Sequence, residues 1–197
     1  KVKKAYLGIK NQLLKDKTIE INMKIGFCGT MSVGKTTLVN ALKELSEFKD
    51  YTFRTERSKY LMEMGIPLNT DSTYKGQLIF TSERAAELMQ ERIITDRTVI
   101  DVMAFSALST SMKESEKFFL SSALMPLIDE YDVLFYVSPE GVEIEDNGVR
   151  ETNANYRMAV DREIKSIVGM HRSNAITIIG TVEERIEQVK NAISQYV

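Results

Sequence analysis

The sequence predicts an α/β fold of three layers, in which helices cover both faces of a five-stranded parallel sheet. Short apolar, β-branched runs alternate with longer amphipathic stretches from Met23 onward, and this alternation is typical of parallel sheets. A Gly-rich turn at residues 29–36 also joins the first apolar run to the first amphipathic stretch. The predicted strands are Met23–Cys28, Tyr51–Thr55, Arg92–Thr95, Val133–Val137 and Ala175–Ile179.

The stretches between these strands repeat their apolar residues with the period of a helix. The third stretch is expected to bury Leu78, Ala85, Leu88 and Met89, and Pro126 is expected to kink or end the fifth. Right-handed crossovers place the carboxyl ends of all five strands at one edge of the sheet, where ligands bind. The predicted helices are Thr36–Leu45, Arg57–Met64, Tyr74–Arg92, Val102–Met112, Glu116–Asp129, Tyr156–Met170 and Val182–Tyr196.

Length and composition fit one domain, 23–197, preceded by a basic lead-in at 1–22. The formal net charge of −2 disfavours a protein that grips duplex DNA through its phosphates, although a local basic groove stays compatible with it. No apolar run reaches the roughly 18 residues of a membrane span. Cys28 is the only cysteine, so no intramolecular disulfide can form, and we expect a reducing, cytoplasmic setting without membrane association.

The turn at 29–36 matches the phosphate-binding pattern G-x-x-x-x-G-K-[ST], the P-loop, at every fixed position. Glycines let successive backbone N–H groups point inward around a phosphate, and the following helix adds its first amides. Lys35 is expected to reach the β- and γ-phosphates of a nucleotide, and the Thr36 hydroxyl to bind Mg²⁺. The motif therefore predicts a nucleoside triphosphate with Mg²⁺, bound in a P-loop NTPase fold. The expected cofactor-binding residues are Gly29, Thr30, Met31, Ser32, Val33, Gly34, Lys35, Thr36 and Thr37.

Charged residues follow two other strands at the same edge of the sheet. Asp96 comes directly after the third strand and is expected to bind Mg²⁺, with Arg97 beside it as a catalytic cation. The alternative for Asp96 is that it caps the next helix. Glu56 ends the second strand and is expected to bind the acceptor, or else to pair with surface charges. Arg57, Tyr60 and Gln77 are further candidates for acceptor binding.

A polar stretch at 141–155 is expected to form a lid that closes over the nucleotide and excludes water. Arg150 is the first candidate for a catalytic lid arginine and Arg157 the second, because a planar guanidinium can span two phosphate oxygens. The alternative is a solvated loop whose arginines pair with neighbouring acidic residues.

With these motifs in place, the chain resembles the nicotinamide-riboside kinase domain of bifunctional NAD-biosynthesis regulators and the AAA-like small kinases around it. The resemblance covers about Met23 to Val197 and rests on GTMSVGKTTLVNAL, on Glu56-Arg57-x-x-Tyr60 and on IITDR. The Asp96-Arg97 pair is also similar to the Asp-Arg step of thymidylate and deoxynucleoside kinases. The resemblance implies the strand order 2-3-1-4-5, ATP and Mg²⁺ at Lys35 and Thr36, Asp96 near Mg²⁺ and acceptor, and Arg150 in the lid.

The sequence departs from this family at two points. It contains no adenylyltransferase domain, and it has Asp-Arg where the riboside kinase has Asp-x-Asp. The function that we expect is ATP- and Mg²⁺-dependent phosphoryl transfer to a nucleoside- or nucleotide-like small molecule. Two alternatives stay open. One is a nucleotide-hydrolysing switch that needs a partner. The other is a kinase of nucleic-acid ends or bases, with a basic groove made by Lys1, Lys3, Lys4, Lys10 and Arg54.

Overall fold

The computed structural model describes residues 22–55, 57–142 and 153–196. It contains a five-stranded sheet in the order β2-β3-β1-β4-β5, and all four neighbouring pairs are parallel, as predicted. Each strand lies within its predicted range, and only β4 fills that range completely. The strands are β1 (Lys24–Cys28), β2 (Thr52–Arg54), β3 (Ile93–Thr95), β4 (Val133–Val137) and β5 (Ile176–Ile178).

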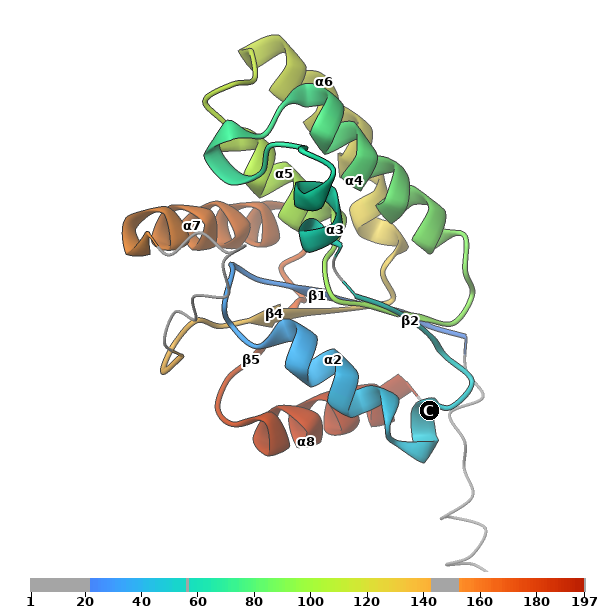
Figure 1. Ribbon diagram of the computed structural model, residues 1–197. Helices are drawn as coiled ribbons and strands as arrows, with labels where there is room; N and C mark the ends of the chain where they lie inside the picture. Colours follow the sequence, from blue (N-terminus) through green and yellow to red (C-terminus); the bar gives the residue numbers. More distant parts are fainter. Residues whose placement is uncertain (1–21, 56, 143–152, 197) are drawn as a thin grey trace, which may run out of the picture.

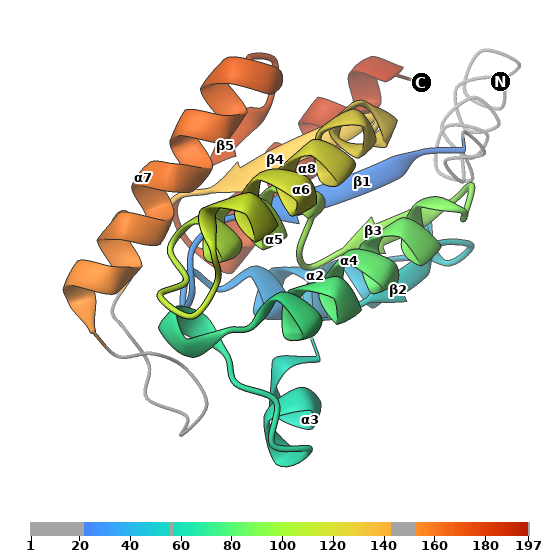
Figure 2. The same ribbon diagram turned by 90° about the horizontal axis from the view of Figure 1, so that it is seen from above.

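Helices cover both faces of the sheet (Figures 1 and 2). On one face lie α2 (Lys35–Lys43) and α8 (Val182–Ile193), which pack against each other. The other side carries α3 (Ser58–Glu63), α4 (Tyr74–Leu88), α5 (Val99–Ala107), α6 (Glu114–Leu124) and α7 (Ala154–His171). Short 3₁₀ turns are η1 (Ser46–Phe48), η2 (Asn69–Asp71), η3 (Met125–Glu130) and η4 (Ser194–Tyr196).

Two hydrophobic cores lie on the two faces of the sheet, because successive side chains of a strand point to opposite sides. In β1, Ile25 and Phe27 join the core under α2 and α8, whereas Cys28 joins the core under the other helices. Phe27 stacks on Phe135 of β4, with ring centroids 5.0 Å apart. This central pair of strands positions the loop that follows Cys28.

Helix α4 buries only part of the face that its apolar residues predicted, because Leu88 is buried but Ala85 is exposed. Leu78 and Met89 are exposed, at 40% and 82%. The buried face instead includes Arg84 and Glu87, whose side chains form an ion pair at 2.6 Å. Because each charge is compensated by its neighbour, these two polar residues can occupy the interior. Burial nevertheless raises the pKa of Glu87, an effect that Arg84 opposes.

Helix α5 begins three residues before its predicted start because a capping box fixes its first turn. Thr98 is the N-cap, and its hydroxyl accepts the N–H of Ile100. The Asp101 carboxylate accepts the N–H of Thr98 in return, at 2.8 Å. At the far end of α6 the chain passes into η3 at Met125, beside Pro126, so the expected helix end is confirmed. The capping box places Asp96 and Arg97 in the short link between β3 and α5.

Several predictions fall outside the described residues. They concern the lead-in except Asn22, the substrate candidate Glu56, and the lid segment between residues 143 and 152, including Arg150. The basic groove expected for a nucleic-acid kinase is likewise outside them, except for Arg54 at the exposed end of β2. Among the helices that the structure describes, none is long and apolar enough to cross a membrane.

Candidate active site

The phosphate-binding loop connects β1 to α2 and turns through conformations that favour glycine. Gly34, the N-cap of α2, is left-handed with φ 82°, and Gly29 has φ 154°. A β-carbon at Gly29 would lie 2.7 Å from the Val137 carbonyl oxygen of β4, so no larger residue fits. No side chain caps α2, and a helix N-terminus of this kind attracts anions. The loop therefore has the geometry that phosphate binding requires.

Lys35 is buried in the curve of this loop, with only 7% of its surface exposed. Its ammonium donates hydrogen bonds to the carbonyl oxygens of Gly29 and Thr30, at 2.5 and 2.8 Å. A cation held inside a ring of backbone groups is suited to the charge of phosphate oxygens. Lys35 thus lies inside the loop, and its contact with the β- and γ-phosphates stays a prediction.

Thr36 and Asp96 meet across the edge of the sheet. The Thr36 hydroxyl donates a short hydrogen bond to the Asp96 carboxylate, which is 1% exposed. The backbone N–H of Asp96 donates to the Arg54 carbonyl at 2.9 Å, so Asp96 is anchored beside β2 and β3. Asp96 does not cap α5, because Thr98 does. The alternative interpretation of Asp96 as a helix cap is therefore wrong.

A hollow lies along the phosphate loop, and Asp96 and Arg97 also line it. Hydroxyl and carboxylate oxygens are the ligands that Mg²⁺ prefers, usually only one or two from the protein with phosphate and water supplying the others. The Thr36 and Asp96 pair fits this requirement. Among the described residues there is no group of three or more His, Cys, Asp or Glu that could hold a metal alone. The residues lining the hollow are Met31, Ser32, Val33, Gly34, Lys35, Thr36, Asp96 and Arg97.

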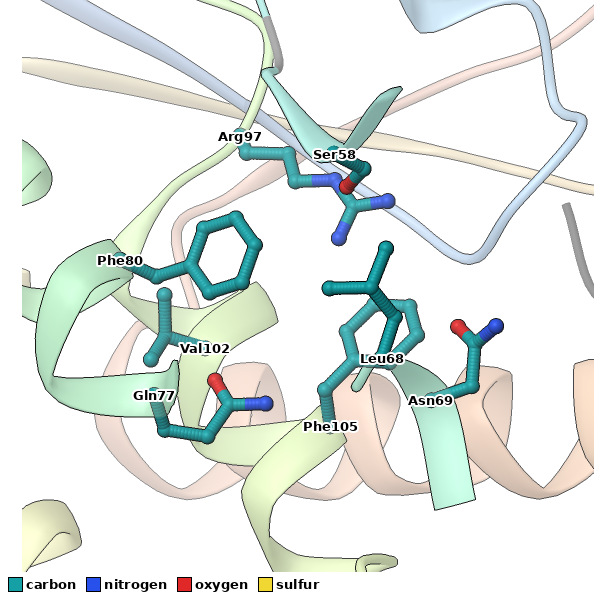
Figure 3. A pocket seen from close by; sticks show the side chains of 8 residues that line it. All are labelled: Ser58, Leu68, Asn69, Gln77, Phe80, Arg97, Val102 and Phe105. Carbon is teal, nitrogen blue, oxygen red and sulfur yellow. The ribbon is translucent and has the colours of Figure 1, made fainter. Parts of the chain in front are cut away.

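A second cavity adjoins the first, and Arg97 lines both of them. Figure 3 shows side chains from α4, α5 and the segment between α3 and α4 converging on it. Its walls are mainly apolar, and Arg97 lies 4.7 Å above the ring of Phe105. Gln77, one of the predicted substrate residues, reaches it from α4 and is 3% exposed. The lining residues are Ser58, Leu68, Asn69, Gln77, Phe80, Arg97, Val102 and Phe105.

Two predicted substrate residues lie outside these cavities. The Arg57 side chain is 56% exposed and pairs with Glu83 of α4 at 3.1 Å. Tyr60 is half exposed on α3, with the Arg57 guanidinium 4.8 Å from its ring centroid. The structure therefore does not bring these two side chains together with Lys35, Asp96 and Gln77.

Arg157, the second candidate for a lid arginine, contacts the phosphate loop from outside. Its guanidinium donates to the carbonyl oxygens of Met31 and Ser32, each at 3.2 Å, and to that of Val142 at 2.9 Å. A guanidinium held by three backbone carbonyls supports the loop in this structure, and a role for Arg157 as a lid arginine stays a prediction. Arg185 of α8 also contacts the loop, and no motif indicated it.

The position of Asp101 in the sequence left it either as a helix cap or as a solvent-facing residue, and the structure confirms the cap and adds a contact with the phosphate loop. It is fully buried, and its carboxylate accepts the N–H of Gly29 at 3.2 Å as well as the N–H and hydroxyl of Thr98. One carboxylate therefore joins the start of the phosphate loop to the start of α5, the helix that carries Phe105. Only the spacing of Thr98 and Asp101, typical of a capping box, could have indicated part of this.

We expect Asp101→Ala to destabilise the fold by about 3 kcal/mol, because it leaves buried donors of Gly29 and Thr98 without their acceptor. Urea denaturation monitored by circular dichroism would measure the change. Asp50→Ala is the matched control, because Asp50 is exposed in the turn before β2. Equal stability of the two variants would show that Asp101 does not hold these elements together.

Comparison with solved structures finds the same fold in nucleoside and nucleotide kinases. Deoxyadenosine kinase from M. mycoides with bound dCTP matches with a TM-score of 0.59 and 16% identity, over 88% of this chain and 100% of that one. Thymidylate kinase from Candida albicans matches with a TM-score of 0.63 and 11% identity, over 89% and 92%. NadR protein in complex with NR matches with a TM-score of 0.62 and 14% identity, over 89% of this chain and 52% of that chain.

The last match spans about half of the NadR chain. The search of curated proteins returned no match. A family model described as AAA domain matches residues 24–185, which include the phosphate loop, all five strands and the first turn of α8. Because this match covers well over half of the chain, the protein belongs to the AAA domain family and has the P-loop fold of nucleotide kinases.

Proposed function

We propose that this protein is a kinase that transfers the γ-phosphoryl group of ATP to a nucleoside- or nucleotide-like small molecule. The observation that carries the proposal is the pair of adjoining cavities, one along the phosphate loop and one lined by aromatic rings, with Arg97 in both linings. A transferase must hold donor and acceptor side by side with a cation between them, and this arrangement supports that reaction.

On the donor side, the phosphate loop and the first turn of α2 would hold the triphosphate. Lys35 would exchange its two carbonyl partners for phosphate oxygens. Thr36 and Asp96 would hold Mg²⁺, which neutralises phosphate charge when it is bound. Arg97 lies at the boundary of the two cavities, where it would stabilise the negative charge of the phosphoryl group during transfer.

On the acceptor side, Phe80 and Phe105 offer apolar faces and Gln77 offers one buried amide. A cavity with these features favours a flat ring that carries hydrogen-bonding groups at its edge. The names of the structural neighbours support this proposal, because they include a deoxyadenosine kinase, a thymidylate kinase and a protein solved with NR. During transfer, an acceptor oxygen forms a bond to the γ-phosphorus, the bond from that phosphorus to the β,γ-bridging oxygen breaks, and ADP leaves. The proton of an acceptor hydroxyl is released to water.

The test is ADP release from ATP and Mg²⁺ across a panel of acceptors. The panel contains nicotinamide riboside, the common nucleosides, the nucleoside and deoxynucleoside monophosphates, and single-stranded DNA. One small acceptor should raise turnover far above the rate without acceptor. Activity on DNA alone would move the acceptor to a polymer. Equal hydrolysis with every acceptor and with none, lost in Lys35→Ala, would leave a nucleotide-hydrolysing protein and contradict the kinase proposal.

Gln77→Leu should lower kcat/KM for a ring-bearing acceptor by about 10- to 100-fold, because an apolar side chain cannot pair with the ring edge. The KM for ATP should change little, since Gln77 does not line the hollow along the phosphate loop. Steady-state kinetics with each substrate varied in turn separates the two effects. Gln90→Leu is the control, because Gln90 is exposed just beyond the end of α4. An unchanged kcat/KM in Gln77→Leu would exclude this cavity as the acceptor site.

A further inference from the structure

Five consecutive carbonyl groups of the phosphate loop, from Gly29 to Val33, accept hydrogen bonds from cationic side chains. Lys35 serves the first two, Arg157 the next two and Arg185 the last. The next carbonyl, that of Gly34, accepts the N–H of Leu38 inside α2. Every carbonyl of the loop thus has a partner, and the two arginines come from helices at the C-terminal end of the chain.

Arg157 contacts the loop through two of the three nitrogens of its guanidinium group and through its own backbone. Nε and Nη2 donate to the carbonyls of Met31 and Ser32, and Nη1 donates to that of Val142. The Thr30 hydroxyl donates to the backbone carbonyl of Arg157 at 3.0 Å. The three nitrogens of a guanidinium reach carbonyls that lie apart from one another, whereas the three donors of a lysine ammonium leave a single atom and need carbonyls that converge on it. This residue therefore joins α7 to the middle of the loop.

Arg185 contacts the end of the loop through one bond, from Nη1 to the Val33 carbonyl at 2.5 Å. The side chain is 2% exposed, and burial lowers the pKa of its guanidinium. Its Nε and Nη2 atoms are buried without a hydrogen-bond partner among the described residues. Burying an arginine in this way costs free energy, so its position calls for a compensating role. The first turn of α8 holds it there, with Thr181 and Glu184 forming a capping box.

The carbonyl oxygen of one residue and the N–H of the next point in opposite directions, because the peptide unit between them is planar and trans. Holding the carbonyls of Met31, Ser32 and Val33 toward the arginines therefore turns the next three N–H groups away from them. These N–H groups belong to Ser32, Val33 and Gly34, three residues that line the hollow along the loop. The two guanidinium charges behind the loop also make the hollow more attractive to anions.

We propose that Arg157 and Arg185 are positioning residues that hold the phosphate loop ready for a triphosphate, without contacting it. The inference rests on the proposed binding of ATP. It also predicts that the two arginines differ in whether lysine can replace them. Arg157 needs its fork, so lysine cannot replace it, whereas Arg185 makes a single bond that lysine can make as well.

The experiment is calorimetric titration of the full chain and its variants with ATP and Mg²⁺, together with thermal unfolding. Arg157→Gln and Arg185→Met should each weaken ATP binding by about 10- to 100-fold, because each removes charged hydrogen bonds to the loop. Arg157→Lys should remain as weak as Arg157→Gln. Arg185→Lys should recover most of the affinity. Arg162→Gln is the control, since it removes one positive charge from an exposed position of α7.

A variant that binds ATP as tightly as the unaltered protein would overturn the role of that arginine. The lysine variants distinguish a role of the arginines in holding the loop for ATP from a role in folding alone. If Arg157→Lys and Arg185→Lys unfold near the temperature of the unaltered protein and bind ATP equally well, the requirement for a fork at Arg157 is wrong. If the unaltered protein itself binds no nucleotide, the proposed function fails and this inference fails with it. Tight binding by the unaltered protein and by both arginine variants would contradict the inference alone.

Discussion

Lys35→Met is expected to abolish measurable phosphoryl transfer, with a loss in kcat/KM of about a thousandfold or more. The substitution keeps the long side chain but removes the charge that the loop encloses. The Lys35 ammonium is 7% exposed and is held by the carbonyls of Gly29 and Thr30, so a phosphate that enters the loop meets it already in position. Without it, negative charge on the transferred group loses its nearest enclosed cation. Steady-state ADP release and calorimetric binding of ATP would measure both losses.

Lys43→Met is the matched control, because Lys43 is exposed in the last turn of the same helix. It removes the same charge from α2, so it should leave kcat/KM within a few-fold of the original value. If Lys35→Met and Lys43→Met have equal activity, the loop does not bind the transferred phosphate. The prediction that Lys35 reaches the β- and γ-phosphates of a nucleotide would then be wrong.

The arrangement of the sheet was predictable because its signals are local. A strand such as β4, with the sequence VLFYV, is a continuous apolar run that fits a position covered on both faces. The phosphate loop is also a local signal, because its glycines stand at the positions where the backbone takes conformations that favour glycine. Gly29 shows why, because its close approach to the Val137 carbonyl excludes a side chain. The strand order depended on the resemblance to known kinases.

Apolar periodicity predicted the inner face of α4 only in part, since Leu88 is buried there as expected but Arg84 and Glu87 are buried beside it. A pattern of hydrophobic residues assumes that charged side chains stay in water, and Arg84 with Glu87 breaks that assumption by pairing inside the protein. Leu78 of this helix and Met89 just beyond its end are exposed. The orientation of this helix also turns Gln77 toward the second cavity.

The long-range contacts of the site could not be predicted from the sequence for a different reason. Arg185 lies 152 residues from Val33, and Arg157 lies 125 residues from Ser32. No local pattern connects residues so far apart, and the helices that carry them show ordinary surface sequences. Arginine near the end of a chain suggests a solvated side chain or, as for Arg157, a lid. Only the packing of α7 and α8 beside the loop assigns these two residues to it.

Asp96→Asn should lower kcat by about 100- to 1000-fold, because it removes the negative charge beside the proposed Mg²⁺ position and leaves the shape of the side chain unchanged. The amide oxygen can still accept the Thr36 hydroxyl, so the fold and the link to α2 should survive. The concentration of Mg²⁺ needed for half-maximal activity should rise. Binding of ATP without Mg²⁺ should be unchanged or tighter, since the triphosphate no longer meets a carboxylate.

These two opposite shifts distinguish a metal-binding role from a structural one. If Asp96 had only a structural role, Asp96→Asn would weaken ATP binding equally with and without Mg²⁺. It would also lower the unfolding temperature. Asp50→Asn at the exposed turn before β2 controls for the loss of one negative charge. If Asp96→Asn needs no more Mg²⁺ than the unaltered protein, Asp96 does not hold the metal. The short bond from Thr36 would then serve to fix α2 against β3, and the metal ligands would have to come from Thr36 and the phosphates.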